Sequence, residues 1–254
     1  MGKTVAIVNQ KGGVGKTTSA VNLAACIGYT GKKVLLVDID PQGNATSGLG
    51  FNKKSVEKST YDMIVNGTDA KQVLCHTAFR NLDLLPANMG LAGAELELVG
   101  LDNRESRLKT SLAILKSEYD FIFLDCPPAL GLLTLNALSS ADTLLVPIQC
   151  EFFALEGLSQ LMSPVRQIKR LYNPLLELEG VLLTMYDGRL NLTQQVVNEV
   201  KKFFPQKVFA SVIPRNVRLS EAPSYGQPVF YYDRGSNGSL AYERLAQEFL
   251  KKNK

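Results

Sequence analysis

A ten-residue segment near the N-terminus combines three glycines, two lysines and two threonines at a spacing that suits phosphate chemistry. It reads Asn-Gln-Lys-Gly-Gly-Val-Gly-Lys-Thr-Thr over residues 9–18, after an apolar run at 4–8 and before a helical pattern at 19–29. A glycine-rich turn between a strand and a helix lets backbone N–H groups converge on a polyphosphate, and the helix N-terminus adds partial positive charge. The segment therefore predicts a loop that binds a nucleoside triphosphate.

Individual residues of this loop are expected to have distinct roles in binding the nucleotide. Lys16 is placed to reach the β- and γ-phosphates, and the Thr17 hydroxyl is placed to bind Mg²⁺. The surrounding backbone supplies the phosphate cradle. The nucleotide-binding residues expected in the loop are Lys11, Gly12, Gly13, Val14, Gly15, Lys16, Thr17 and Thr18.

The loop departs from the common G-x-x-x-x-G-K-[ST] pattern, because residue 10 is glutamine where that pattern has glycine. A second lysine, Lys11, stands beside Gly12 instead. A lysine in a loop is often a solvated surface residue. Since Lys16 already serves the local cradle, we interpret Lys11 as a second cation that acts on an active site outside its own subunit.

Acidic residues follow two later apolar runs. Asp38 and Asp40 come after the run 34–37, and Asp125 follows the run 121–124, as in a Walker B element. A carboxylate at the edge of a buried sheet costs desolvation unless a cation or donor matches it. We predict that Asp40 orients the attacking water and that Asp125 acts near Mg²⁺, with Thr17, Asp40 and Asp125 as the metal set. For Asp38, capping of the next helix is the alternative.

Apolar runs and helical patterns alternate along the whole chain without a linker. This predicts a single α/β domain over residues 1–254, a P-loop NTPase with a mostly parallel twisted sheet covered by helices on both faces. The glycine-rich loop, both acidic segments and residues 214–218 each begin where a predicted strand stops, so they should meet at one edge of the sheet. Predicted strands are 4–8, 33–37, 82–86, 121–124, 143–147, 180–185 and 208–213; predicted helices include 19–29, 104–117, 155–171, 192–203 and 240–251.

Composition narrows the class of protein. The chain has 254 residues, 45% of them hydrophobic, and no apolar stretch near the roughly 20 residues that span a membrane. Four cysteines lie far apart, which suits reduced thiols in a cytoplasmic protein better than disulfides or a zinc site. The single histidine, His76, leaves little for a histidine-based metal site, and we interpret it as an incidental loop residue.

Six motifs follow one another over nearly the whole chain: NQKGGVGKTT, LLVDIDPQGNATSGLG, FIFLDCPPALGLLTLNAL, PIQCEFFALEGLSQL, GVLLTMYDGRLNL and VIPRNVRLSEAPSYGQPV. They resemble those of the ParA family of chromosome-partitioning ATPases, most closely its small Soj type, within the ParA/MinD deviant Walker A superfamily. Because the first predicted strand begins at residue 4, no N-terminal helix-turn-helix extension is expected.

The resemblance implies a role for each matching residue. Lys11 would be the signature lysine that acts across a dimer, Lys16 the P-loop lysine, and Gly12 part of the close-packed dimer interface. Thr17 would ligate Mg²⁺, Asp40 would be required for hydrolysis, and Asp125 would be the Walker B acid. The segment Pro214, Arg215, Asn216 and Val217 would flank the adenine, with Asn216 reading its edge.

The resemblance also implies a cycle and its partners. ATP and Mg²⁺ would drive a homodimer that binds double-stranded DNA without sequence preference, and a ParB/Spo0J-type protein would stimulate a slow basal hydrolysis. Such a protein would be cytoplasmic and associated with the nucleoid, with no membrane partner.

The distribution of charge agrees with a nucleic-acid partner. Residues 181–254 contain 11 Lys/Arg and 6 Asp/Glu, whereas residues 1–180 contain 17 and 18. An ordinary solvated basic surface is the alternative interpretation. Through the resemblance, Arg189 and Arg218 are the expected DNA-binding residues, and Arg215 is ambiguous because it also belongs to the base-binding segment.

Two other classes of protein share the deviant loop. A membrane-bound regulator of the MinD type would need a lipid-binding terminal helix, but Leu240, Leu245, Phe249 and Leu250 suggest a helix that packs on the core. An electron-transfer ATPase of the nitrogenase-iron-protein type would need cysteines that bridge a cluster, for which Cys126 and Cys150 are the nearest candidates. We expect neither activity.

Overall fold

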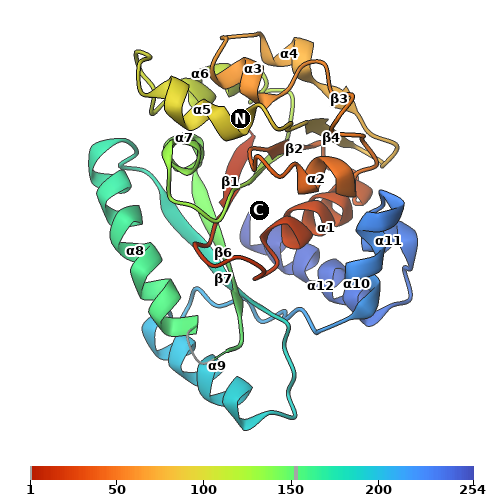
Figure 1. The fold of residues 1–254 in the computed structure, drawn as a ribbon. Coiled ribbons are helices and arrows are strands. Elements are labelled where there is room, and N and C mark those ends of the chain that lie inside the picture. Colours follow the sequence, from red (N-terminus) through yellow and green to blue (C-terminus); the bar gives the residue numbers. More distant parts are fainter. Residues whose placement is uncertain (1, 152–153) are drawn as a thin grey trace.

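A computed structural model describes residues 2–151 and 154–254, and its centre is a seven-stranded sheet between two layers of helices (Figure 1). The strand order is β3-β4-β2-β5-β1-β6-β7, and every neighbouring pair is parallel except β3 with β4. The strands are β1 Lys3–Ile7, β2 Val34–Asp38, β3 Cys75–His76, β4 Leu82–Leu85, β5 Phe121–Asp125, β6 Thr143–Gln149 and β7 Glu177–Thr184.

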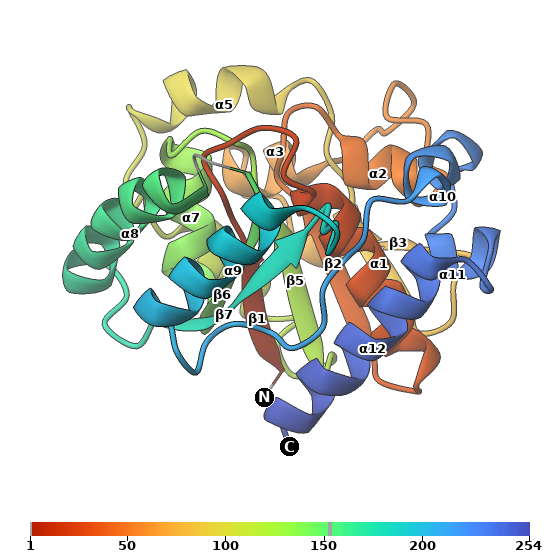
Figure 2. The ribbon, with the colours of Figure 1, turned by 90° about the horizontal axis from the view of Figure 1, so that it is seen from below.

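Helices cover both faces of this sheet, as Figures 1 and 2 show. One layer contains α1, α2, α11 and α12, and the other contains α3 to α9. The helices are α1 Lys16–Tyr29, α2 Asn44–Gly48, α3 Thr60–Ile64, α4 Ala70–Val73, α5 Leu91–Leu98, α6 Arg107–Leu112, α7 Leu132–Ser140, α8 Ala154–Leu171, α9 Asn191–Phe203, α10 Val217–Glu221, α11 Val229–Tyr232 and α12 Asn237–Lys252, with a 3₁₀ turn, η1, at Ala222–Tyr225.

The two layers exist because alternate residues of each central strand point to opposite faces of the sheet. On β1, Val5 and Ile7 join the core under α1 and α12, whereas Ala6 joins the core under α7 and α8. All three side chains are fully buried. The near-continuous apolar runs of the sequence are therefore strands buried on both faces, as the fold class predicted.

One predicted strand, 208–213, is wrong. Val208 and Pro214 each form only an isolated bridge, to Val181 and Tyr186. Between them, the amides of Ala210 and Ser211 donate to the Glu248 carboxylate of α12, both at 2.8 Å. Because a side chain from a distant helix takes these amides, the segment does not form a continuous ladder with β7.

Smaller differences concern element ends. The helix predicted over 104–117 is limited to Arg107–Leu112. In α12, Leu245 and Phe249 are buried as expected, but Leu240 is 40% exposed and was wrongly assigned to the core. No helix in the described part of the chain is long and apolar enough to cross a membrane.

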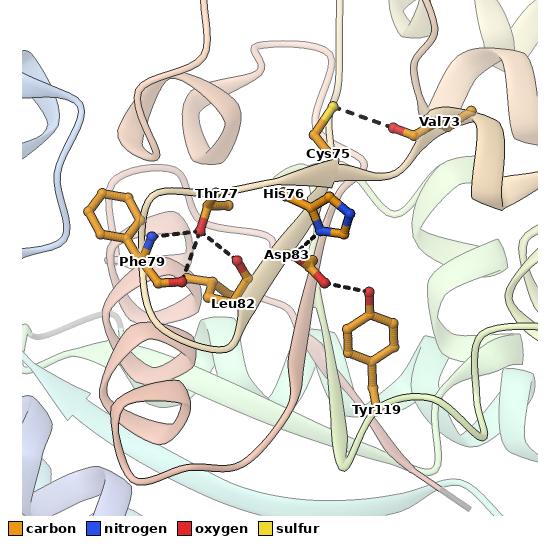
Figure 3. A network of polar contacts seen from close by, with 8 residues as sticks. All are labelled: Val73, Cys75, His76, Thr77, Phe79, Leu82, Asp83 and Tyr119. Carbon is orange, nitrogen blue, oxygen red and sulfur yellow. Dashed lines mark hydrogen bonds and ion pairs between the residues drawn. The ribbon is translucent and has the colours of Figure 1, made fainter.

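The short antiparallel strand β3 was missed, and it places His76 in a strand instead of a loop. Figure 3 shows the polar network at this edge of the sheet. His76 Nδ1 lies 2.8 Å from Asp83 Oδ1, and the Tyr119 hydroxyl donates to Asp83 Oδ2 at 2.8 Å. This network ties β3, β4 and the approach to β5 together, far along the chain from the glycine-rich loop.

Candidate nucleotide-binding site

The glycine-rich loop connects the end of β1 to the first turn of α1. Gly13 and Gly15 have φ angles of 73° and 88°, a left-handed backbone that favours glycine, and Gly15 is the N-cap of α1. Lys11, Gly12 and Gly13 are exposed, whereas Val14 is buried. The loop thus lies at the positive end of a 14-residue helix, the arrangement that binds phosphate.

Two polar side chains fasten the loop to neighbouring strands. Asn9 donates to the carbonyl oxygen of Pro147 on β6 at 2.7 Å, and its own oxygen accepts from the amide of Lys11 at 2.9 Å. Thr184, at the end of β7, donates to the carbonyl oxygen of Val14 at 2.9 Å. The loop conformation is therefore supported by β6 and β7 as well as by its own glycines.

The two loop lysines have different environments. Lys16 is buried, and its Nζ donates to the carbonyl oxygen of Lys11 at 3.0 Å. Burial lowers the pKa of Lys16, while the nearby Asp125, Cys126 and Asp40 raise it. Lys11, by contrast, points outward, and its Nζ lies 2.7 Å from Glu151 Oε2.

The acidic residues meet where β2 and β5 end. Asp38 and Asp125 are register partners on these adjacent strands, and both are fully buried. The amide and hydroxyl of Thr46 donate to Asp38 at 2.8 and 2.7 Å, so Asp38 holds the first turn of α2, as the capping alternative anticipated. Asp40 accepts from the amide of Gln42 at 2.9 Å.

Asp125 differs from Asp38 because neither of its oxygens has a hydrogen-bond partner among the described residues. Burial and then the charge of Asp38 raise the pKa of Asp125 well above its ordinary value, and the nearby Thr17 hydroxyl offsets part of that rise. Burial also raises the pKa of Asp38 to about 6, against the lowering effect of Thr46. A buried, unpartnered carboxylate of this kind calls for a cation.

The chemistry of these side chains fits a magnesium ion that has further oxygen ligands. Mg²⁺ is usually bound by one or two carboxylates together with water and phosphate oxygens. Within residues 2–151 and 154–254, no three His, Cys, Asp or Glu side chains form a metal cluster of their own. Asp125 and the Thr17 hydroxyl would therefore hold the ion together with a bound phosphate, and Asp40 lies close enough to influence the same charges.

A cavity of about 190 Å³ adjoins the loop at the N-terminal end of α1. It brings Pro214, Arg215 and Asn216 beside the glycine-rich loop, although nearly 200 residues separate them. Val217 does not line the cavity and is 66% exposed. The Asn216 oxygen accepts from the amide of Arg218 at 3.0 Å and so caps α10, which fixes the position of its amide group. The lining residues are Gly15, Thr18, Thr184, Met185, Ile213, Pro214, Arg215, Asn216, Leu219, Ser220 and Tyr242.

Comparison with known proteins gives the family. A family model described as an AAA domain matches residues 2–178. The sporulation initiation inhibitor protein Soj of Bacillus subtilis is 58% identical over 248 residues, which are 98% of each chain. The chromosome partitioning protein ParA of Myxococcus xanthus is 50% identical over 253 residues, 100% of this chain and 89% of that one. The chain belongs to the Soj/ParA family of chromosome-partitioning ATPases.

The solved structures agree with this Soj/ParA-family fold. A Mycobacterium smegmatis protein, described as cobyrinic acid a,c-diamide synthase with bound ADP and magnesium, is 36% identical and has a TM-score of 0.87. The match covers 99% of this chain and 95% of that one. The P-loop ATPase architecture predicted from the motifs is thereby confirmed.

Several cavity residues of this Soj/ParA-family chain were missed from the sequence. Thr184 ends an apolar strand just as Asp125 does, so the same signal was available for it. Met185 lies next to it with a φ of 49°, unusual for a residue other than glycine. Tyr242 belongs to α12, and its hydroxyl lies 3.1 Å from Ser19 Oγ of α1. No local pattern predicts that last contact, since it joins helices at opposite ends of the chain.

The two expected DNA-binding arginines lie near the same end of the sheet. The Tyr186 amide donates to the Ile213 carbonyl oxygen at 3.0 Å, which joins the segments that carry Arg189 and Arg218. Arg189 binds Asp187 at 2.7 Å, which holds the pKa of that carboxyl down at about 2, and its side chain is 89% exposed. Arg218 lies 2.7 Å from Glu221 and 3.1 Å from Asp233. Both cations are thus accessible but already paired with carboxylates.

The cysteines considered for a metal cluster are enclosed. Cys126 is fully buried, and its thiol donates to the carbonyl oxygen of Leu124 at 3.6 Å. Burial raises the pKa of Cys126 well above its ordinary value and that of Cys150 to about 11. Because the thiolate is the form that ligates metal, these environments disfavour ligation.

Proposed function

We propose that this chain is an ATP-dependent partitioning switch: ATP binding drives a sandwich dimer that binds DNA non-specifically, and hydrolysis releases it. The observation that carries the proposal is the buried Asp125 beside the glycine-rich loop, whose carboxylate oxygens have no hydrogen-bond partner in the part of the chain that the structure describes. A fold that keeps a carboxylate in this state without a partner loses stability, and a bound cation with a polyphosphate would recover it.

ATP and Mg²⁺ are the proposed ligands. The N-terminus of α1 and Lys16 would bind the phosphates, Thr17 and Asp125 would hold the ion, and the cavity at Pro214–Asn216 would receive the base. The magnesium ion would neutralise charge on the β- and γ-phosphates. The bound ADP and magnesium of the M. smegmatis structure support this choice of ligands.

Hydrolysis would depend on Asp40, which would orient the attacking water towards the γ-phosphate. Its position on a short turn after β2, held by the Gln42 amide, supports this role. The proposed basal rate is slow, and a ParB/Spo0J-type partner would accelerate it.

Dimerisation would use the exposed side of the loop. Lys11 and Gly12 are exposed, and among the described residues, apart from the two chain neighbours, no atom lies within 4 Å of the position that a Cβ on Gly12 would take. A partner's nucleotide can therefore approach this backbone closely. Lys11 would reach across to that nucleotide, so two ATP molecules would lie between the subunits.

DNA binding would follow from the dimer, because it places two copies of Arg189 and Arg218 on one particle. Joining two weak phosphate-binding surfaces raises the overall affinity by effective concentration. Contacts with phosphates carry no sequence information and weaken steeply with salt. This would associate the ATP-bound protein with the nucleoid.

The test is a DNA-binding titration of the Asp40→Ala variant, whose turnover should be blocked, with no nucleotide, ADP or ATP, each with Mg²⁺. We expect binding to unrelated duplexes only with ATP, and an affinity that falls as salt rises. Arg189→Ala/Arg218→Ala in the same background should keep the dimer and weaken DNA binding. Equal binding in all nucleotide states would refute the switch.

A further inference from the structure

Lys11, the residue proposed to act across the dimer, is already engaged within its own subunit. Its Nζ lies 2.7 Å from Glu151 Oε2, and the two side chains are 43% and 44% exposed. Its amide is held by Asn9 at 2.9 Å, and its carbonyl oxygen accepts from Lys16 at 3.0 Å. Every polar group of Lys11 therefore has a partner in the same chain.

The carboxylate and backbone of Glu151 are also held by hydrogen bonds within the same chain. It lies in the short connection between β6 and α8, where its carboxylate accepts from Gln149 Nε2 and its amide donates to the Gln149 carbonyl oxygen at 2.8 Å. The Ala154 amide in turn donates to the carbonyl oxygen of Glu151 at 2.9 Å. The carboxylate that receives Lys11 is thus attached to the edge of the sheet and to the start of a long helix.

Strand β6, which precedes this connection, runs beside the start of the glycine-rich loop. Val8 donates to the Leu145 carbonyl oxygen at 3.1 Å, and Asn9 donates to that of Pro147 at 2.7 Å. The contact between Lys11 and Glu151 is the next link in the same series. It holds the lysine side chain against a carboxylate of its own subunit.

We propose that Glu151 is a positioning residue that restrains Lys11 in the monomer and so sets the threshold for dimerisation. This inference rests on the proposed function, in which Lys11 contacts the partner's nucleotide. To make that contact, Lys11 must exchange one carboxylate for phosphate oxygens. The exchange is favourable only when the opposite site contains a highly charged polyphosphate. The attraction between Lys11 and this anion must exceed both the lost pairing with Glu151 and the repulsion between the anion and the freed Glu151 carboxylate.

Two such ion pairs break when one dimer forms. An exposed pair contributes little by itself, so the restraint is a threshold and does not block dimerisation. Removing the charge with Glu151→Gln should tighten the ATP-bound dimer by about 2- to 30-fold, the range that two exposed pairs allow. If Glu151 instead stays with Lys11 and orients it in the dimer, the same substitution should weaken the dimer.

The experiment compares three proteins in the Asp40→Ala background: the parent, Glu151→Gln, and the matched control Glu156→Gln. Glu156 is an exposed carboxylate on α8 whose only side-chain hydrogen bond among the described residues is accepted from Gln160. Sedimentation equilibrium with saturating ATP and Mg²⁺ gives each dimer dissociation constant. We expect a tighter dimer for Glu151→Gln alone.

A second measurement reports the restraint without any nucleotide. An amine-reactive acetylating reagent, followed by peptide mass spectrometry, gives the labelling rate of Lys11 relative to Lys71. Lys71 is a suitable internal reference, because it forms a 2.6 Å ion pair with Glu118 at similar exposure. Labelling of Lys11 should become faster in Glu151→Gln and stay unchanged in Glu156→Gln.

The outcomes separate the two proposals. An unchanged or weaker dimer in Glu151→Gln, or an unchanged labelling rate of Lys11, overturns the role of Glu151 while the partitioning switch stands. If the parent itself forms no dimer with ATP, the proposed function fails and the threshold role fails with it, and faster labelling would then show only that the ion pair exists.

Discussion

Replacing Asp125 with asparagine should stabilise the nucleotide-free protein while it weakens binding of Mg²⁺ and ATP. The side chain is fully buried, has no hydrogen-bond partner among the described residues, and is the register neighbour of another buried carboxylate, Asp38. Asparagine keeps the shape of the side chain and removes its charge. The gain in stability and the loss of ligand binding therefore have one cause.

The size of the gain follows from burial. An unsatisfied buried polar group costs about 1–3 kcal/mol, and a charged one costs more. Asparagine still buries an amide, so we expect a net stabilisation of about 1–3 kcal/mol at pH 7. This is a large effect for one substitution, since most surface substitutions stay within about 0.5 kcal/mol.

The gain should depend on pH in a defined direction. The folded-state pKa of Asp125 is raised above its unfolded value, so the folded protein binds this proton more tightly than the unfolded chain does. The destabilisation caused by Asp125 is therefore absent below the unfolded-state pKa of 3.8, and it increases as the pH rises above that value. The advantage of Asp125→Asn should therefore be smaller at pH 5 than at pH 7.

Urea unfolding in EDTA, without nucleotide, measures this directly at both pH values. The matched control is Asp38→Asn, because Asp38 accepts two hydrogen bonds from Thr46 and should lose stability when one acceptor oxygen becomes an amide. If Asp125→Asn destabilises the nucleotide-free protein at pH 7 by about 1 kcal/mol or more, the carboxylate has a structural partner and the reasoning is refuted.

Three further predictions use other contacts. Thr184→Val should cost about 1–3 kcal/mol in urea unfolding, because it leaves a buried carbonyl oxygen of the glycine-rich loop unpaired, and it should weaken ATP binding in calorimetry. Gly226→Ala, with a φ of 64° and a neighbouring backbone atom 2.6 Å from the new Cβ, should cost about 2–5 kcal/mol, whereas Gly67→Ala, with a similar φ in open space, should cost about 1–2 kcal/mol. Equal costs for the two would contradict the close approach. Arg189→Ala/Arg218→Ala should change stability by less than about 1 kcal/mol but reduce the salt dependence of DNA binding, and an unchanged salt slope would place the DNA elsewhere.

Much of the fold was predictable because the sheet is parallel and buried on both faces. Its strands are continuous apolar runs, and residues 4–8, 82–86 and 121–124 each match a strand to within one residue. The prediction failed for 208–213, where Glu248 of α12 takes two backbone amides. A hydrogen-bond acceptor on a distant helix cannot be recognised from the local pattern of apolar residues.

In the candidate site, too, some features could be predicted from the sequence and others could not. The glycine-rich loop and Asp125 carry their chemistry in their local sequence, and the carboxyl ends of parallel strands must meet at one edge. Other contacts depend on side-chain positions that the spacing of residues does not define. Examples are the ion pair of Lys11 with Glu151 and the hydrogen bond from Thr46 to Asp38. The hydrogen bonds by which Asp38 holds the first turn of α2 could not be predicted from the spacing of the sequence.

The most direct test of the central claim is sedimentation velocity of Asp40→Ala protein with a fluorescent duplex of arbitrary sequence, in ATP and in ADP. The account predicts that ATP with Mg²⁺ converts the 27.8 kDa chain into a dimer that carries the DNA with it, and that ADP leaves protein and DNA to sediment separately. A monomer that carries the DNA equally in both nucleotides would contradict it.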